Sequence, residues 1–195
     1  MTLDAPPAPD PLTLPMHKDG LVVVVIETPR GSGNKIKYDT ELGVYRLDRA
    51  LPAGLTFPFD FGFIPQTLAE DGDPLDAIVL LDSPVHPGTV VLARLIGMLE
   101  AEQQDGGVGR WTRNDRLIAV AGGPKGHASL RSLRDMDPFE LDAIGSFFGS
   151  YHALDGDKFR VTGHTGVGAA RIAMRRAAAA YRDSQASNRN GQGRT

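Results

Sequence analysis

Runs of hydrophobic residues alternate with short polar segments through the first two thirds of the chain, and each run has the length of a β-strand. The clearest run is Leu21–Glu27, where four consecutive valines suit a buried, pleated strand. Residues 35–39 and 44–48 flank the turn Glu41–Gly43, which predicts a hairpin. Further extended segments are predicted at residues 57–64, 77–81, 90–100 and 117–121.

The last third of the chain changes to helical spacing. In Pro138–Leu154 the side chains of Ile144, Phe147 and Tyr151 fall on one apolar face, and Asp137 is suited to cap the helix. Val167–Tyr181 is rich in alanine and arginine and predicts a second helix. Strands followed by helices favour an α+β fold, with a small barrel or curved sheet flanked by two main C-terminal helices.

The two ends of the chain differ in composition from the middle. Residues 1–19 contain prolines at positions 6, 7, 9, 11 and 15, which predicts a flexible arm or one draped over the surface. Residues 184–195 are polar and contain glycine, so we expect them to be disordered. We therefore expect one folded domain over residues 20–183.

Composition excludes several classes of protein. The net charge is −3, whereas binders of nucleic acid or membrane surfaces usually carry a basic excess. The absence of cysteine excludes disulfides, cysteine-ligated metals and thiol chemistry. No apolar run approaches the roughly 20 residues of a membrane span, and no secretory pattern opens the chain. We expect a cytoplasmic protein.

The segment Glu70–Asp76 carries the strongest chemical signal. It packs four acidic residues into seven, around Gly72 and Pro74, which bend the backbone so that carboxylates can converge. Close carboxylates repel unless a cation neutralises them, and a hard divalent cation does so well. A solvated acidic turn is the alternative, but the apolar run 77–81 follows directly. Lysine and arginine around the early hairpin could cover the charge of a phosphate ligand, or could be ordinary surface charges.

Four segments in this order and spacing resemble the family I soluble inorganic pyrophosphatases: Glu27–Lys35, Leu47–Arg49, Phe57–Leu68 and Asp71–Asp76. The resemblance resumes at Arg116–Val120 and Phe147–Tyr151. It implies a five-stranded OB-like barrel with helices packed outside. It also implies hydrolysis of pyrophosphate to two phosphates with Mg²⁺, or with Mn²⁺ or another divalent metal, in a homo-oligomer.

The resemblance also assigns roles to residues. Asp71 and Asp76 match metal ligands, and Asp73 matches the carboxylate that helps to deprotonate the attacking water. The implied substrate-binding residues are Lys35, Arg49, Tyr151 and Arg116, and Glu27 lines the cavity.

Several positions depart from the family pattern. Lys37 stands where the family has a glutamate, Phe57 and Phe61 replace tyrosines, and Arg116 and His152 replace lysines. Two metal-binding aspartates become Gln103 and Asn114, with Glu102, Asp105 and Asp115 as acidic neighbours that could line the cavity.

These departures leave three hypotheses open. The first is an inorganic pyrophosphatase, the second a hydrolase of another phosphoanhydride such as a nucleotide or short polyphosphate, and the third a non-catalytic phosphate-binding homologue. Fewer carboxylates predict fewer bound metals, and Lys37 and Arg116 could stand in for metal charge. His152 could bind phosphate or could interact with the helix dipole.

Overall fold

Five strands close into a ring in the computed structural model, which describes residues 9–121 and 126–192. The order around the ring is β2-β5-β6-β9-β7, and β7 pairs with β2 to close it. Strands β6 and β9 run parallel, and the other pairs in the ring are antiparallel. This ring confirms the predicted small OB-like barrel in an α+β fold. The strands are β2 (Leu21–Thr28), β5 (Asp60–Phe63), β6 (Asp76–Leu80), β9 (Arg116–Val120) and β7 (Val90–Gln104).

Strand β7 is longer than the predicted segment, which ended at Glu100. Its far end pairs with β8 (Thr112–Arg113) and with β10 (Lys158–Gly166). The sequence analysis did not predict β10. That strand contains Gly163 and Gly166 and has many exposed polar positions, so it lacks a hydrophobic run. The short strand β1 (His17–Lys18) adds an edge next to β2.

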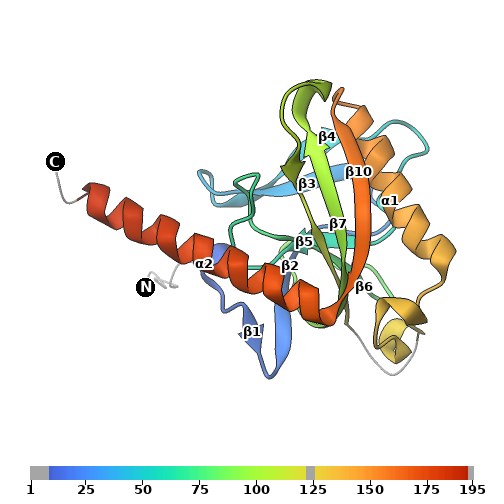
Figure 1. Ribbon diagram of the computed structural model, residues 1–195, viewed down its shortest axis with the longest axis horizontal. Coiled ribbons are helices and arrows are strands. Elements are labelled where there is room, and N and C mark those ends of the chain that lie inside the picture. The colour runs from blue at the N-terminus through green and yellow to red at the C-terminus, as the bar shows by residue number, and fades with distance from the viewer. Residues whose placement is uncertain (1–8, 122–125, 193–195) are drawn as a thin grey trace, which may run out of the picture.

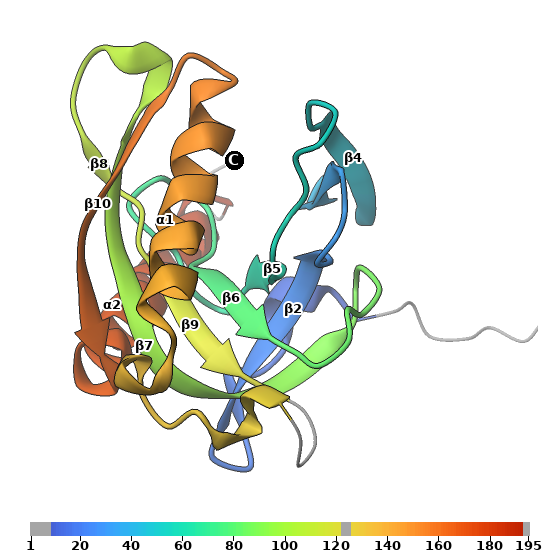
Figure 2. The same ribbon diagram turned by 90° about the vertical axis from the view of Figure 1, so that its right-hand side faces the viewer.

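The predicted hairpin is confirmed as a separate two-stranded sheet. It consists of β3 (Asn34–Asp39) and β4 (Val44–Ala50), with Asp39 paired to Val44 beside the turn. In Figure 2 the hairpin and α1 (Pro138–Ala153) stand on opposite sides, with β5 between them. This arrangement places side chains of the hairpin opposite side chains of α1.

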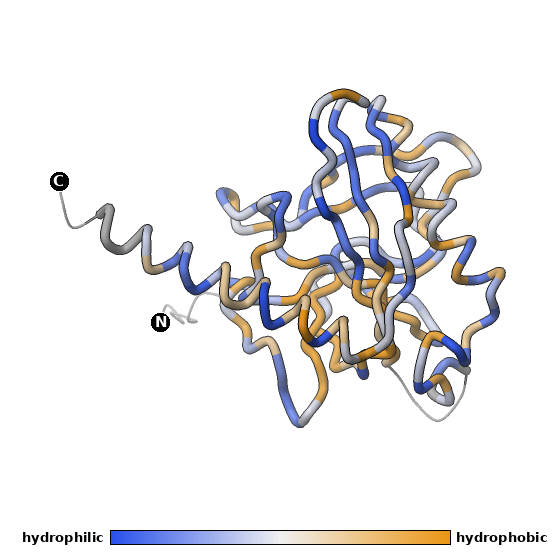
Figure 3. The backbone as a smooth tube through the Cα atoms, viewed as in Figure 1, coloured by the Kyte–Doolittle hydropathy of each residue, from blue (hydrophilic) through white to orange (hydrophobic). Residues whose placement is uncertain are grey.

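Both faces of the barrel strands are buried, which explains why their sequences are hydrophobic runs. Along β6, Ala77 and Val79 pack in a cluster with residues of α2 (Val167–Gln192), while Ile78 and Leu80 pack in a second cluster with residues of α1. Figure 1 shows the two helices at different faces of the strands. In Figure 3 the tube is mostly hydrophobic where the strands cross and hydrophilic along much of the outer ends of β7 and β10.

The helix start at Asp137 is confirmed. Its Oδ1 accepts a hydrogen bond of 2.9 Å from the Phe139 backbone N–H, and Pro138 occupies the first turn. Short 3-10 helices form at Pro11–Thr13, Asp105–Gly107, Gly126–Ser129 and Leu133–Asp135. Among the described residues, none of the helices combines the length and hydrophobicity that a membrane span requires.

The two ends of the chain are more ordered over their described residues than the sequence analysis expected. In the N-terminal segment, the Leu12 and Thr13 carbonyls accept hydrogen bonds from Gln66, and Met16 packs against the core. Helix α2 continues past the predicted end at Tyr181 to Gln192, into the segment for which we predicted disorder. Alanine, glutamine and arginine are good helix formers, and no proline interrupts this stretch. The domain boundaries at residues 20 and 183 stay predictions.

Candidate functional site

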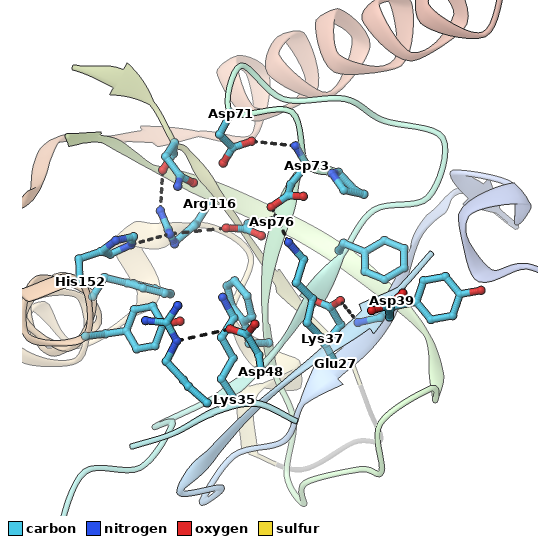
Figure 4. Close-up of a pocket in the computed structure, with 18 of the residues that line it drawn as sticks. Glu27, Lys35, Lys37, Asp39, Asp48, Asp71, Asp73, Asp76, Arg116 and His152 are labelled. Carbon is cyan, nitrogen blue, oxygen red and sulfur yellow. Dashed lines mark hydrogen bonds and ion pairs between the residues drawn. The ribbon is translucent and has the colours of Figure 1, made fainter. Parts of the chain in front are cut away.

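A cavity of about 640 Å³ lies between the β3–β4 hairpin, the ends of the barrel strands and the C-terminal part of α1. Figure 4 shows charged side chains from these elements pointing into it. The cavity wall includes fourteen residues singled out in the sequence: Glu27, Lys35, Lys37, Arg49, Phe57, Phe61, Asp71, Asp73, Asp76, Gln103, Asn114, Arg116, Tyr151 and His152. The fold therefore brings together residues that lie more than 120 positions apart in the sequence.

Asp71, Asp73 and Asp76 lie together at one end of the cavity, which we call the acidic end, and a tight turn positions the first two. The Asp71 Oδ1 accepts a hydrogen bond of 3.1 Å from the Asp73 backbone N–H, and Gly72 between them has a φ of 92°, which favours glycine. Asp76 follows as the first residue of β6. Burial raises the pKa of Asp71, and the nearby Asp73 carboxylate adds to the effect. Burial also raises the pKa of Asp76, to about 6, although Arg116 opposes the shift.

Glu27 lies at the floor of the cavity with only 7% of its surface exposed. Its Oε1 accepts a hydrogen bond of 2.7 Å from the Tyr38 backbone N–H, which ties β2 to β3. Burial nonetheless raises the pKa of Glu27 to about 7. This carboxyl group therefore changes its charge near neutral pH.

Lys37 reaches across the cavity to the acidic end. Its Nζ lies 2.7 Å from Asp73 Oδ2, and about a third of the side chain is exposed. Lys35 and Lys37 alternate along β3, so both face the cavity. Burial lowers the pKa of Lys37, but the hydrogen bond and charge of Asp73 outweigh burial and the net shift is upward. The Asp73 carboxylate is thus held by an ammonium group.

Arg116 is a buried cation at the back of the cavity, with 3% of its surface exposed. Its guanidinium lies 3.5 Å from Asp76 Oδ2, donates to the Asn114 carbonyl at 2.6 Å and stacks 4.0 Å from the centre of the Phe148 ring. Its Nη2 lies 3.4 Å from His152 Nε2. These contacts fix the position of a charge that burial would otherwise make costly.

His152 carries no charge at neutral pH. Burial lowers its pKa to about 3, and Arg116 adds to this effect. Its ring stacks on Phe159 with the centroids 4.9 Å apart. A neutral ring interacts only weakly with the helix dipole, and this interpretation from the sequence stays a prediction. Phosphate binding by this ring stays a prediction.

Two cationic side chains, those of Lys35 and Arg49, lie over the Tyr151 ring. The Lys35 Nζ lies 5.3 Å and the Arg49 Cζ 5.2 Å from the centre of its ring. Arg49 also pairs with Asp48 at 3.4 Å and with Asp155. Within the described part of the chain, the buried Tyr151 hydroxyl has no hydrogen-bond partner. A polar ligand in the cavity can provide one.

Comparison with known proteins places this geometry in a family. The model of the inorganic pyrophosphatase family matches residues 24–182, which is most of the chain. The chain belongs to the inorganic pyrophosphatase family. It is 38% identical over 165 residues to an inorganic pyrophosphatase of Nostoc sp., an alignment that covers 85% of this chain and 94% of the relative. It is also 42% identical over 146 residues to that of Thermus thermophilus, covering 73% and 80%.

Solved structures of the family agree with the fold. The crystal structure of the Thermus thermophilus inorganic pyrophosphatase matches with a TM-score of 0.81 at 37% identity, over 89% of this chain and 99% of that one. The Helicobacter pylori inorganic pyrophosphatase matches with a TM-score of 0.77 at 32% identity, over 87% and 99%. The resemblance inferred from the sequence is confirmed.

Three predicted cavity residues lie elsewhere, which corrects the sequence analysis. Glu102 pairs with Arg160 at 2.6 Å, Asp115 accepts from the Ala101 backbone N–H at 3.2 Å and pairs with Arg113, and Asp105 accepts from Gln103 at 3.2 Å. None of the three lines the cavity. Successive residues of an extended chain point to opposite faces. Since Gln103 and Asn114 face the cavity, their neighbours Glu102 and Asp115 face away from it.

The sequence analysis missed several carboxylates that line the cavity, among them Asp155 and Asp157. These two come from the loop after α1, where Asp155 pairs with Arg49 and Asp157 accepts from the Gly106 backbone N–H at 2.7 Å. The sequence Asp155-Gly156-Asp157 repeats the Asp-Gly-Asp pattern of residues 71–73, and this repetition was the available signal.

Family membership implies a divalent metal cofactor, and the acidic end has suitable donors. Asp71, Asp73 and Asp76 offer hard oxygen ligands, and burial, together with the neighbouring carboxylates, raises the pKa values of Asp71 and Asp76. However, no three His, Cys, Asp or Glu side chains converge as a metal site anywhere in residues that the structure describes. Asp73 is turned to Lys37 and Asp76 faces Arg116. The carboxylates of the acidic end are therefore suitable ligands for a cation once the ion pair between Lys37 and Asp73 is broken.

The side of the cavity that carries Gln103 and Asn114 does not fit a metal. Gln103 and Asn114 present neutral amides, and the Asn114 Nδ2 donates to the Gln103 Oε1. Neutral amides neutralise none of the charge of a hard cation. Gln103 and Asn114 thus add no anionic ligand to those of the acidic end.

Proposed function

We propose that this cavity binds inorganic pyrophosphate and hydrolyses it to two phosphates with the help of a divalent metal. One observation carries the proposal: the carboxylates of Asp71, Asp73 and Asp76 line the same cavity as the cationic side chains of Lys35, Lys37, Arg49 and Arg116. Hydrolysis of a phosphoanhydride requires cations around the phosphates and a base beside the attacking water. Membership of the inorganic pyrophosphatase family supports the choice of substrate.

Lys35, Arg49 and Arg116 are proposed to bind the phosphate oxygens. The first two lie beside Tyr151, whose buried hydroxyl is available to donate to the same ligand. Arg116 faces the cavity from its back wall, and a planar guanidinium suits phosphate. The remaining wall is shaped by Glu27, Phe61, Asn114 and His152.

Asp71 and Asp76 are proposed to hold the metal, for which Mg²⁺ is the first choice and Mn²⁺ the second. When bound, such an ion neutralises phosphate charge and makes water more acidic. Asp73 is proposed to accept a proton from water as the water oxygen attacks one phosphorus. The bridging P–O bond breaks, and the second phosphate leaves with the bridging oxygen. Asp73 can do this only when Lys37 has released its Oδ2.

Non-catalytic binding of phosphate is the second candidate. The Lys37–Asp73 ion pair favours it, because a carboxylate bound to an ammonium group is a weaker proton acceptor. The neutral amides of Gln103 and Asn114 favour it too, since they remove metal ligands. The predicted cytoplasmic location and homo-oligomeric state, and the prediction that neither nucleic acid nor membrane is a partner, apply to both candidates.

Release of phosphate decides between the candidates. We expect purified protein to release phosphate from pyrophosphate with Mg²⁺ or Mn²⁺ but not with EDTA, and faster than from a nucleoside triphosphate or tripolyphosphate. Asp73→Ala should lower the rate by roughly 100-fold or more, since it removes the proton acceptor. Asp142→Ala, at an exposed site on α1, is the matched control and should leave the rate unchanged.

Three results would contradict this proposal. Absence of phosphate release with any divalent metal would leave non-catalytic binding. Faster cleavage of a nucleotide or polyphosphate would change the substrate. An unchanged rate in Asp73→Ala would reject the role of this aspartate.

A further inference from the structure

We propose that Lys37 and Arg116 act as built-in counter-ions at the acidic end, so that the cavity binds pyrophosphate without a divalent metal. The inference rests on the proposed function for the identity of the ligand. It concerns the ionic partner that this chain itself supplies. Lys37 can change its ionic partner when a ligand enters, whereas Arg116 is held in place.

Lys37 is the exchangeable cation. Its Nζ contacts Asp73 at 2.7 Å, and the field of Glu27 and Asp76 also acts on it. With about a third of its side chain exposed, it is attached to β3 by a flexible four-carbon stem. An ammonium group has three donors, and the structure assigns one of them to Asp73. The others can reach an anion that enters the cavity.

Arg116 is the fixed cation. The Asn114 carbonyl, the Phe148 ring and Asp76 hold its guanidinium in one place. Its Nε is buried and, within residues 9–121 and 126–192, has no hydrogen-bond partner. A guanidinium offers five N–H donors in a rigid fork that matches phosphate oxygens. Arg116 therefore supplies positive charge at the back of the cavity without any metal.

The side of the cavity around Tyr151 adds two further cations. Lys35 and Arg49 both lie over the Tyr151 ring, whose buried hydroxyl has no hydrogen-bond partner among the described residues. A pyrophosphate ion carries several negative charges and has phosphate oxygens at both ends. Cations at both ends of the cavity can neutralise such an ion along its length.

The same geometry makes Lys37 a competitor of the metal. The Lys37 ammonium group interacts electrostatically with Asp76, a proposed metal ligand, so its positive charge repels a divalent ion bound there. Removal of the Lys37 charge should therefore weaken metal-free binding of pyrophosphate and strengthen binding of the metal alone. An ordinary structural salt bridge would not produce these two opposite effects.

Isothermal titration calorimetry of the full chain tests both effects. Pyrophosphate is titrated into wild type, Lys37→Met and Lys18→Met in EDTA, and the non-hydrolysable analogue imidodiphosphate is titrated into the same proteins in Mg²⁺. Lys18 is an exposed lysine on β1, away from the cavity, and is the matched control. We expect wild type and Lys18→Met to bind pyrophosphate in EDTA. Lys37→Met should bind it roughly tenfold to a hundredfold more weakly, the loss of a charge-assisted hydrogen bond. A titration of Mn²⁺ alone should show tighter binding to Lys37→Met.

The outcomes separate this inference from the proposed function. Binding of imidodiphosphate in Mg²⁺ without binding of pyrophosphate in EDTA would overturn the inference and leave the proposed function standing. Equal binding in EDTA by wild type and Lys37→Met would overturn the role of Lys37. No binding under either condition would overturn both. Circular dichroism of each variant verifies that the fold is intact.

Discussion

The Lys37–Asp73 ion pair links the two halves of the site at the scale of single residues. A carboxylate that is proposed to accept a proton and a lysine that is proposed to bind phosphate neutralise each other at 2.7 Å. Entry of an anion gives Lys37 another partner, which releases the Asp73 oxygen. The empty and filled cavities should therefore differ in the contacts of these two side chains.

Glu27 predicts that stability depends on pH. Burial raises the pKa of this carboxyl from 4.5 to about 7. Between these values the folded protein binds more protons than the unfolded chain, so the free energy of unfolding falls as pH rises. The upper limit of this loss is about 3 kcal/mol for a shift of this size. In Glu27→Gln the decrease between pH 5 and pH 8 should be smaller by about 2 kcal/mol.

Urea unfolding at both pH values, in EDTA, measures this difference. Glu41→Gln, which changes an exposed glutamate at the turn of the hairpin, should keep the wild-type pH dependence. An identical pH dependence in wild type and Glu27→Gln would show that Glu27 does not change its charge in this range.

Replacing the amides of Gln103 and Asn114 with carboxylates should make the cavity bind a divalent metal more tightly. The two amides face the cavity and are hydrogen-bonded to each other, so replacing both places two carboxylates side by side. The double variant Gln103→Asp/Asn114→Asp should bind Mn²⁺ at least about tenfold more tightly than wild type, because anionic oxygens hold hard cations. Calorimetry measures the affinity, and Gln185→Glu on α2 controls for added charge. Unchanged affinity would mean that this wall is too far from the metal position.

Among the elements, closure of the barrel depends on Gly62 of β5. A Cβ at this position would lie 1.9 Å from the Val25 carbonyl oxygen and 2.8 Å from the Ile26 Cα of β2. Gly62→Ala should therefore separate β5 from β2 and lower the free energy of unfolding by at least about 2 kcal/mol. Both strands support the cavity, so pyrophosphate binding should weaken as well.

Gly149 provides the matched control for Gly62. A Cβ there meets nothing within 4 Å, and the residue lies inside α1. Gly149→Ala should raise the free energy of unfolding by roughly 0.5–1 kcal/mol, because alanine favours the helix. Urea unfolding of both variants checks the pair. Equal stability of Gly62→Ala and wild type would show that the barrel tolerates a wider gap between β2 and β5.

Elements buried on both faces could be predicted from the sequence, and elements with an exposed face could not. The valine run of β2 and the apolar face of α1 could be recognised in the sequence because buried positions require hydrophobic residues. Strand β10 was missed because its exposed positions are polar and Gly163 breaks the register with β7. The end of α2 was placed too early because that helix continues without a hydrophobic pattern.

The site followed a similar rule. Turn chemistry and spacing were enough to identify Asp71, Asp73 and Asp76. Glu102 and Asp115 were misplaced because a shift of one residue along a strand reverses the face of a side chain, and spacing alone does not determine register. Asp155 was missed because its contact with Arg49 depends on how α1 packs beside the hairpin.

On the scale of the whole molecule, the cavity exists only where three separate parts meet. The hairpin supplies Lys35 and Lys37, the barrel supplies Asp76 and Arg116, and α1 supplies Tyr151. No part has both the carboxylates and the full set of cations. Binding of a diphosphate should therefore join the hairpin to the barrel and to α1, and should stabilise the folded protein by an amount that grows with the logarithm of the ligand concentration above Kd.

A crystal structure of the full chain with Mg²⁺ and imidodiphosphate, a non-hydrolysable diphosphate analogue, tests the central claim most directly. The predicted result is one diphosphate in the cavity, in contact with Lys35, Arg49 and Arg116, with Lys37 turned from Asp73 to a phosphate oxygen and one metal ion at the acidic end. A diphosphate bound outside this cavity, or a second metal ion at Gln103 and Asn114, would contradict the account.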